Sequence, residues 1–102
     1  LMWRMDRGYG ALRAMTPQLK RKPSDYLRDH FYVTTHPADG PERPEHLRLL
    51  LEMTDAEHML LFAGGFPDWD FDDPSRIGES LGENVKEKAL RTNALALYKL
   101  RR

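Results

Sequence analysis

Residues 60–74, LLFAGGFPDWDFDDP, decide the fold, because a short apolar run leads directly into a loop rich in carboxylates. The apolar residues 60–62 are typical of a buried strand. Gly64 and Gly65 then allow the backbone to turn or to approach another group closely. Four aspartates follow, at Asp68, Asp70, Asp72 and Asp73. The stretch predicts a strand that ends in an active-site loop, and any function of this chain is expected there.

Outward from this stretch, helices and strands alternate along the chain. Periodicity and capping residues predict helices over residues 2 to about 14, 23–29, 44–54 and from about 83 onward, with a short helix or loop at 75–81. Asp55 tolerates the left-handed conformation that ends a helix. The β-branched and aromatic run 31–35 predicts a strand buried on both faces, and a second strand is predicted at about 59–63. This order favours two parallel strands, each followed by a helix packed on one side of the sheet.

Most of the chain resembles the metal-dependent amidohydrolases of the family that includes aminocarboxymuconate-semialdehyde decarboxylase. In that family the segment commonly reads Leu-Phe-Ser-Ser-Asp-Tyr-Pro-His-Trp-Asp-Phe-Asp, which aligns without gaps to residues 61–72. Further matching pieces are WRMD (3–6), LKRKPSDYLRDHFYVTT (19–35), PEHLRLLLEM (44–53) and ENVKEKALRTNALALYKL (83–100). The match is to the C-terminal third of the family only. Asn93 and Ala94 match a family-typical pair, which implies a hydrogen-bonding and packing role.

The resemblance implies a (β/α)8 barrel, a fold of about 250 residues. With 102 residues, this chain supplies only the last two βα units and a C-terminal helix. We therefore expect an α/β fold that is a partial TIM barrel, with residues 1–102 forming its C-terminal portion and not an independent full domain. Two strands leave two open edges that must pair with something. The expected partner is a larger amidohydrolase-like chain that completes the barrel.

The resemblance also implies a divalent metal, usually zinc, held by imidazoles and by an aspartate after the last barrel strand. That position is Gly65 in this chain, so the family ligand is absent, and no closely spaced pair of histidines replaces it. We expect this chain alone to bind no metal, and a zinc ion to be held mainly by the partner chain. Asp68, which stands where the family commonly has histidine, is expected nearest to Gly65. The remaining aspartates, Asp70 to Asp73, are expected further out on the loop.

Three residues are candidates for the site, and Asp68 is the candidate catalytic residue. His36 follows the strand at 31–35 and is expected at the barrel mouth, where loops carry function. It either contacts substrate or a metal, or it ends the strand and faces solvent. Trp69 either binds substrate by stacking or anchors the loop by packing, as Phe71 does. The other histidines show no ligand spacing and are expected to be structural: His30, His46 and His58.

The composition excludes several classes of function. The chain has 16 basic and 16 acidic residues, and no basic stripe with interleaved aromatics, so it lacks the electrostatic footprint of a nucleic-acid binder. It contains no cysteine, which excludes disulfides and thiolate metal sites. It has no apolar stretch near the ~20 residues of a membrane span. We expect a cytoplasmic protein that contacts neither nucleic acid nor membrane.

Three interpretations of function stay open. The chain is a small subunit or C-terminal part of a metal-dependent hydrolase or decarboxylase, acting on a small-molecule substrate only once its partner is bound. Alternatively, it is a non-catalytic scaffolding subunit with a degenerate site. It is otherwise a gene remnant or a fragment without a function of its own. The sequence of a co-purifying chain, with the missing strands and a His-x-His motif, separates these interpretations.

Overall fold

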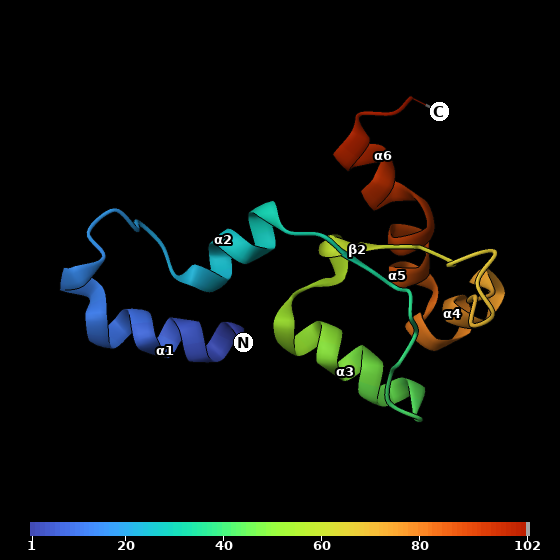
Figure 1. Ribbon diagram of the computed structural model, residues 1–102, viewed down its shortest axis with the longest axis horizontal. Coiled ribbons are helices and arrows are strands. Elements are labelled where there is room, and N and C mark those ends of the chain that lie inside the picture. The colour runs from blue at the N-terminus through green and yellow to red at the C-terminus, as the bar shows by residue number, and fades with distance from the viewer. Residues whose placement is uncertain (102) are drawn as a thin grey trace. The chain divides into compact units, whose positions relative to one another are not determined.

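The computed structural model describes residues 1–101, which form two compact units (Figure 1). The first unit is Leu1–Phe31, and the second begins at Tyr32. Each unit is described by itself. The predicted loop and both predicted strand ends belong to the second unit, so every candidate site residue lies in one compact body.

The first unit is a pair of helices. Helix α1 spans Met2–Leu12, a 3-10 turn follows at Arg13–Met15, and α2 spans Pro23–His30. Both predicted helices are confirmed. Oδ1 of Asp6 accepts the backbone N–H of Ser24, at 2.9 Å, and so satisfies one of the free N–H groups at the start of α2. Hydrogen bonds from the hydroxyl and backbone of Ser24 hold the pKa of the Asp6 carboxyl below its usual value.

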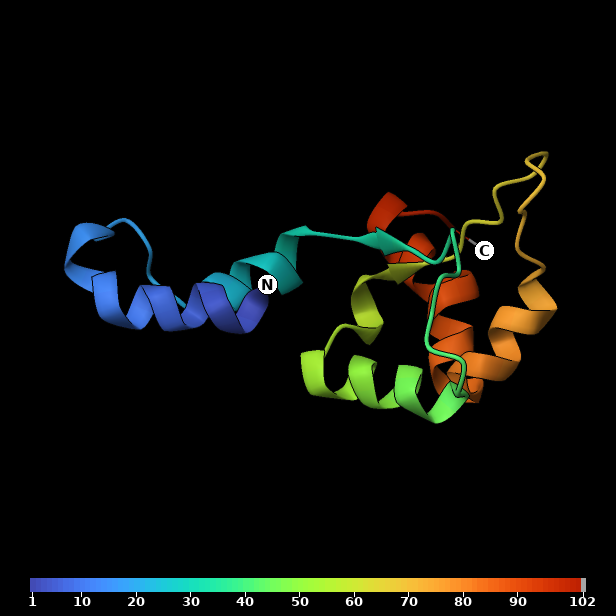
Figure 2. The same ribbon diagram turned by 60° about the horizontal axis from the view of Figure 1, so that its bottom comes forward.

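The second unit contains two parallel strands and the helices that follow them. Strand β1 (Val33–Thr34) leads to α3 (Pro44–Thr54), and a 3-10 turn (Glu57–Met59) leads to β2 (Leu60–Leu61). After β2 come α4 (Pro74–Leu81), α5 (Glu83–Glu87), a π-helical turn (Lys88–Thr92) and α6 (Asn93–Tyr98). Val33 pairs with Leu60 and Thr34 with Leu61. The strands lie side by side with α3 and α4 on one side of them (Figure 2), which confirms the predicted parallel order.

Local sequence signals set the helix boundaries of this unit. Pro44 and Pro74 lie in the first turn of α3 and α4, where the missing N–H costs no hydrogen bond. Asp73 caps α4, since its Oδ1 accepts the backbone N–H of Ser75 at 2.8 Å. Asp55 ends α3 in the left-handed conformation, with φ +50°, as predicted. Pro44 and Asp55 thus set the ends of α3 as predicted, and residues 75–81, for which a short helix or a loop was predicted, belong to α4.

The core of the second unit lies between β2, α3 and the helices after β2. Its buried members are Leu60, Ile77, Leu81 and Ala89, with Leu47, Leu51, Phe62 and Val85 packed against them. Nδ2 of Asn93 donates to the carbonyls of Glu57 and Leu60, at 2.9 and 2.8 Å. The predicted hydrogen-bonding role of Asn93 is thus confirmed, and it fixes β2 against the C-terminal helices.

The prediction for residues 31–35 needs correction. The strand is shorter than predicted, and Val33 is 47% exposed, whereas burial on both faces was expected. The reason is that, among the described residues, the core of this unit packs against β2 and contains no residue of β1. β2 differs, because Leu60 and Leu61 are both buried. The apolar sequence of β1 matches a buried parallel strand, but this chain alone does not cover it.

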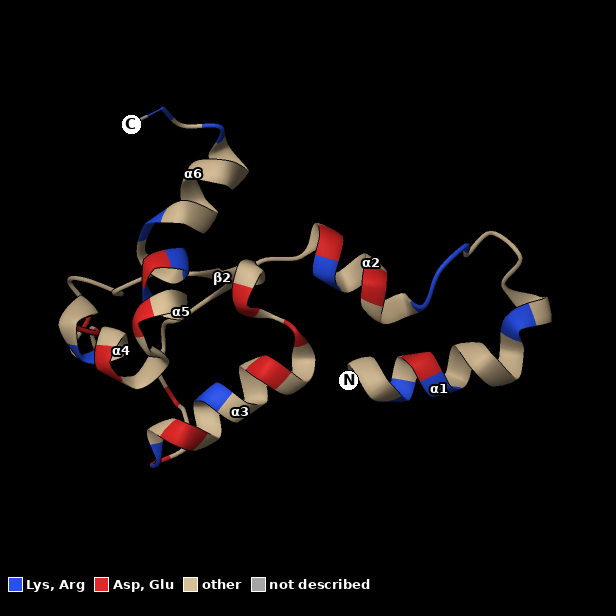
Figure 3. Ribbon diagram, turned by 180° about the vertical axis from the view of Figure 1, so that it is seen from behind, with Lys and Arg blue, Asp and Glu red and all other residues tan. Residues whose placement is uncertain are grey.

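Charges are mixed over the helices of both units. Lys and Arg alternate with Asp and Glu along the same helices, including α1, α2, α3 and α5 (Figure 3). This agrees with the balanced composition of the sequence. Among residues 1–101, no helix combines the length and apolar character that crossing a membrane requires.

Candidate functional site at the strand ends

Thr35 extends the pairing of the two strands and so positions the site. Its backbone N–H donates to the carbonyl of Leu61 at 2.9 Å. Its hydroxyl donates to the carbonyl of Ala63 at 3.3 Å and accepts the backbone N–H of the same residue at 3.2 Å. The chain therefore leaves both strands at the same point. His36 follows directly on one side and Gly64 and Gly65 on the other.

The imidazole of His36 occupies the space that a side chain at Gly65 would fill. Gly65 has φ +71°, a conformation that residues with side chains rarely adopt. A Cβ at this position would lie 2.4 Å from Nε2 of His36 and 2.5 Å from Cε1. His36 in this place requires glycine at position 65, because these distances are far below van der Waals contact.

Asp72 fixes the orientation of this imidazole. Its Oδ2 lies 2.7 Å from Nδ1 of His36 and also accepts the backbone N–H of Ala38 at 3.1 Å. The backbone N–H of Asp72 donates to the carbonyl of Gly64 at 2.7 Å, which turns the loop back over the strand end. Because a carboxylate only accepts, Nδ1 carries the hydrogen, and in the neutral ring Nε2 keeps its lone pair.

Two further carboxylates, those of Asp68 and Asp70, lie close to the imidazole of His36. One ligand atom each of His36, Asp68 and Asp70 lies within 4.8 Å of the others, and Nε2 is 3.9 Å from Oδ1 of Asp70. The imidazole is mostly buried, whereas both carboxylates are exposed on the loop and free to rotate. One nitrogen and two oxygens are donors that divalent transition metals accept. The donor set therefore fits a metal ion, although not through the family's ligand position.

The structure brings two of the three candidate residues together. Asp68 and His36 lie in one group, as their place at the strand ends predicts. Trp69 is 95% exposed, so it does not anchor the loop by packing within this chain. Phe71 does pack, edge to face against Phe66, with ring centroids 6.1 Å apart. Substrate binding by Trp69 stays a prediction.

The sequence did not predict two carboxylates that lie beside His36. Asp70 and Asp72 were expected further out on the loop, and this is wrong, because both lie beside His36. The loop turns back through hydrogen bonds from the N–H of Asp68 to the carbonyl of Gly65 (2.8 Å) and from the N–H of Asp72 to that of Gly64 (2.7 Å). The alternation of aspartates at 68, 70 and 72 does not predict this contact, because residues 66–70 form turns and not an extended strand.

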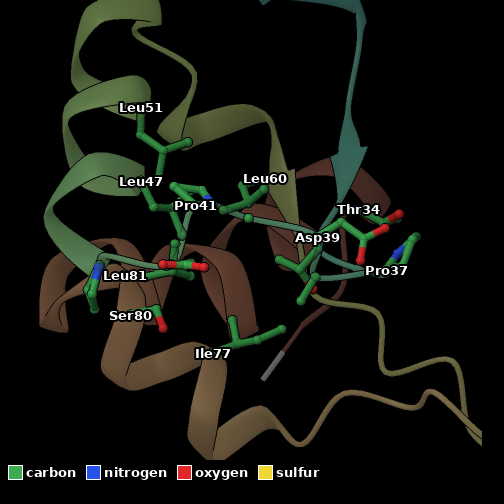
Figure 4. A pocket seen from close by; sticks show the side chains of 15 residues that line it. Thr34, Pro37, Asp39, Pro41, Leu47, Leu51, Leu60, Ile77, Ser80 and Leu81 are labelled. Carbon is green, nitrogen blue, oxygen red and sulfur yellow. The ribbon is translucent and has the colours of Figure 1, made fainter.

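A separate cavity of about 280 Å³ lies beneath the loop that follows His36. Figure 4 shows Pro37, Asp39 and Pro41 of this loop on one side and side chains of α3 and α4 on the other. Its apolar wall comes from five residues of the core region: Leu47, Leu51, Leu60, Ile77 and Leu81. The cavity shares no residue with the group of His36, Asp68 and Asp70.

Comparison with known proteins agrees with this geometry. The family model of the amidohydrolases (amidohydrolase family 2) matches residues 2–100, so the chain belongs to this family. A search of curated proteins finds no match. The parallel strand pair with its helices is consistent with part of the amidohydrolase TIM barrel, and the family is metal-dependent.

Proposed function

We propose that this chain supplies the last two βα units of an amidohydrolase-type barrel, and that a larger amidohydrolase-like chain supplies the other strands and the histidine metal ligands. The assembled protein acts as a metal-dependent hydrolase or decarboxylase on a small molecule. The exposed edge of β1 carries this proposal. Phe31, Tyr32 and Val33 are exposed in this chain, although their sequence is that of a buried parallel strand.

Unpaired backbone groups and uncovered apolar surface at β1 favour pairing with further strands. A strand at the edge of a sheet presents free N–H and C=O groups that pair readily with another chain. A parallel sheet is normally covered on both faces, which two strands do not achieve. Further strands beyond β1 and β2 would satisfy both needs. The family match over residues 2–100 supports a barrel as the source of these strands.

In this proposal, the residues at the strand ends have distinct roles. A divalent metal on the partner's imidazoles supplies the water activation that the family chemistry uses. Asp68 lies at the mouth and takes or gives a proton near the reacting group. His36, held by Asp72 through Nδ1, and the exposed Trp69 contact the substrate. The imidazole of His36, and not a ligand carboxylate, fills the space beside Gly65.

Co-purification with identification of the bound chain tests the assembly. We expect a bound chain whose sequence contains the missing strands and a His-x-His motif. Val33→Asp places a charge on the exposed face of β1 and should abolish the association. Met15→Asp, which charges an exposed apolar side chain outside the strand pair, should affect it much less. A chain that stays monomeric beside a co-expressed amidohydrolase-like partner of this kind contradicts the proposal.

One observation favours a second candidate function, a scaffolding subunit without catalysis. Gly65 removes the only side chain that the family would use as a ligand from this part of the barrel, and His36 closes the space. Such a subunit would still cover the open strands of its partner. The two functions separate on the assembled protein. In the scaffolding case, Asp68→Asn leaves any activity of the complex unchanged, whereas Val33→Asp still prevents assembly.

A further inference from the structure

We propose that His36, Asp68 and Asp70 form a zinc site of this chain's own, with Asp72 as the residue that orients the imidazole. This goes beyond the proposed function, because it requires no partner chain. It also opposes the expectation from the sequence that this chain alone binds no metal. The two alternatives predict opposite results in a titration of the isolated chain.

The three donor atoms lie close enough together to share one zinc ion. Ligand atoms lie about 2.0–2.2 Å from a zinc ion, so two ligands of one ion are about 3–4 Å apart. Nε2 of His36 and Oδ1 of Asp70 are 3.9 Å apart, and all three ligand atoms lie within 4.8 Å of one another. A small rotation of the two exposed carboxylates is enough to bring them to bonding distance. The buried imidazole does not need to move.

The orientation of the imidazole supports the same site. Metal-bound histidines commonly donate their other ring N–H to a carboxylate, which fixes the ring and makes the ligand nitrogen more basic. Asp72 provides this contact, with Oδ2 at 2.7 Å from Nδ1 of His36. Asp72 is itself fixed by the backbone N–H of Ala38, at 3.1 Å. Nε2, which lies 3.9 Å from Oδ1 of Asp70, therefore has its lone pair available before any ion is bound.

The space beside Gly65 gives further support. Any side chain there would displace the imidazole, since a Cβ would meet three of its atoms at 2.4–2.8 Å. The chain thus lacks the aspartate that the resemblance implies at this position. The imidazole of His36, a nitrogen donor, occupies the volume that the aspartate side chain would enter. The imidazole can lie here only because residue 65 has no side chain. This observation is independent of the carboxylates on the loop.

The choice of ion follows from the donors. Calcium and magnesium prefer sites made of oxygen atoms only, whereas imidazole suits zinc and other late first-row metals. Three protein ligands leave a fourth position of a tetrahedral zinc ion open to water. We therefore expect zinc to bind at least tenfold more tightly than calcium or magnesium.

Calorimetric titration of the full chain with zinc chloride, without a partner, tests the proposal. We expect one equivalent of zinc per chain. His36→Gln should weaken binding at least a hundredfold and Asp70→Asn at least tenfold. Asp72→Asn should weaken it about 10–100-fold through the orientation of the ring alone. Gly65→Ala should also weaken binding, because its methyl group displaces the imidazole.

Two matched variants control for general loss of charge or of imidazole. His46→Gln and Asp39→Asn replace an exposed histidine and an exposed carboxylate outside the group, and zinc should bind to both as to the parent chain. As a second readout, zinc should shift the 15N resonance of Nε2 of His36 and leave His46 unchanged. Circular dichroism of Asp70→Asn verifies the fold, since this side chain lies on the exposed loop.

Two outcomes overturn the proposal. One is the absence of saturable zinc binding by the folded parent chain. The other is equal binding by the parent chain, His36→Gln and Asp70→Asn, which means adventitious binding elsewhere. Neither outcome bears on the assembly of the barrel, which Val33→Asp tests. The zinc site and the assembly of the barrel therefore fail or stand separately.

Discussion

Gly65 and His36 compete for one volume, and this competition is the main determinant of the site at the scale of single residues. Asp at position 65 would place a carboxylate where the resemblance to the family implies a ligand, and aspartate tolerates positive φ better than most residues. Its Cβ nevertheless lies 2.4 Å from Nε2 of His36. We expect Gly65→Asp to lower the free energy of unfolding by about 1–3 kcal/mol, the usual cost of overpacking.

The matched double variant distinguishes steric conflict from backbone strain. The double variant Gly65→Asp with His36→Ala lacks the imidazole ring. It should recover most of the free energy of unfolding that Gly65→Asp alone loses, which gives a coupling energy of about 0.5–3 kcal/mol. Urea denaturation of the parent, both single variants and the double variant measures this coupling. Strictly additive effects would show that His36 does not occupy the space beside Gly65.

Asp73 gives a prediction for the dependence of stability on pH. Hydrogen bonds from the hydroxyl and backbone N–H of Ser75 lower the pKa of its carboxyl below 3.8. A lowered pKa in the folded state means that the cap contributes stability above pH ~3.8, and that this contribution is lost as the pH falls through the folded pKa. Asp73→Ala should be less stable than the parent near neutral pH, and the difference should shrink in acid.

Unfolding midpoints of parent and Asp73→Ala between about pH 6 and pH 2 provide the measurement. Asp39→Ala is the control, because Asp39 is exposed on a loop and caps no helix of the structure. Its difference from the parent should stay small at every pH. A difference for Asp73→Ala that grows towards low pH would contradict the cap.

At the scale of elements, truncation of Leu81 in α4 should lower the stability of the second unit strongly. Leu81 is 3% exposed and packs with Leu60, Ile77 and Ala89 in the small core. Leu81→Ala should cost about 2–5 kcal/mol, the range for buried leucines. Leu49→Ala on the exposed face of α3 should change stability by about 0.5 kcal/mol or less. Equal effects of the two in chemical denaturation would place the core elsewhere.

Element boundaries were predictable from the sequence where the signal is local. Pro44, Pro74 and Asp55 set the ends of α3 and α4 through backbone geometry, which needs no knowledge of distant residues. The lengths of the strands were not predictable in this way, because strand pairing joins residues far apart in the sequence, such as Val33 and Leu60. Val33 shows this, since its sequence context predicts burial and its side chain is 47% exposed.

The location of the site was predictable from the sequence, but the full set of side chains that form it was not. His36 and Asp68 follow the two strands, so a shared mouth follows from parallel pairing. The contact between His36 and Asp72 spans 36 residues and depends on the loop folding back on Gly64. No local pattern encodes such a contact. The absence of a side chain at Gly65 predicted a vacant ligand position, whereas the structure fills that space with an imidazole.

At the scale of the whole molecule, the small core and the open strand argue for function in an assembly. Small domains bury a modest share of their surface and gain much from a partner. Here the buried apolar residues of the second unit are few, among them Met59, Leu60, Leu61, Ile77, Leu81 and Ala89. Apolar residues of β1 and α3 remain exposed, including Val33, Leu50 and Met53. A second chain that completes the sheet would bury the exposed apolar residues of β1 and so stabilise the present chain.

Turnover by the assembled protein gives the last prediction. If the complex is an enzyme, Asp68 lies at the end of a barrel strand, which is where barrel enzymes carry their reacting groups. Asp68→Asn keeps the size of the side chain and removes its charge and its capacity to exchange a proton. We expect turnover to fall at least tenfold, about 1.4 kcal/mol in barrier height, with assembly intact by gel filtration. Asp39→Asn, an exposed carboxylate outside the group, should leave turnover unchanged. Full turnover in Asp68→Asn would remove this carboxylate from the mechanism, and the scaffolding function would then explain both the open strand and the glycine at position 65.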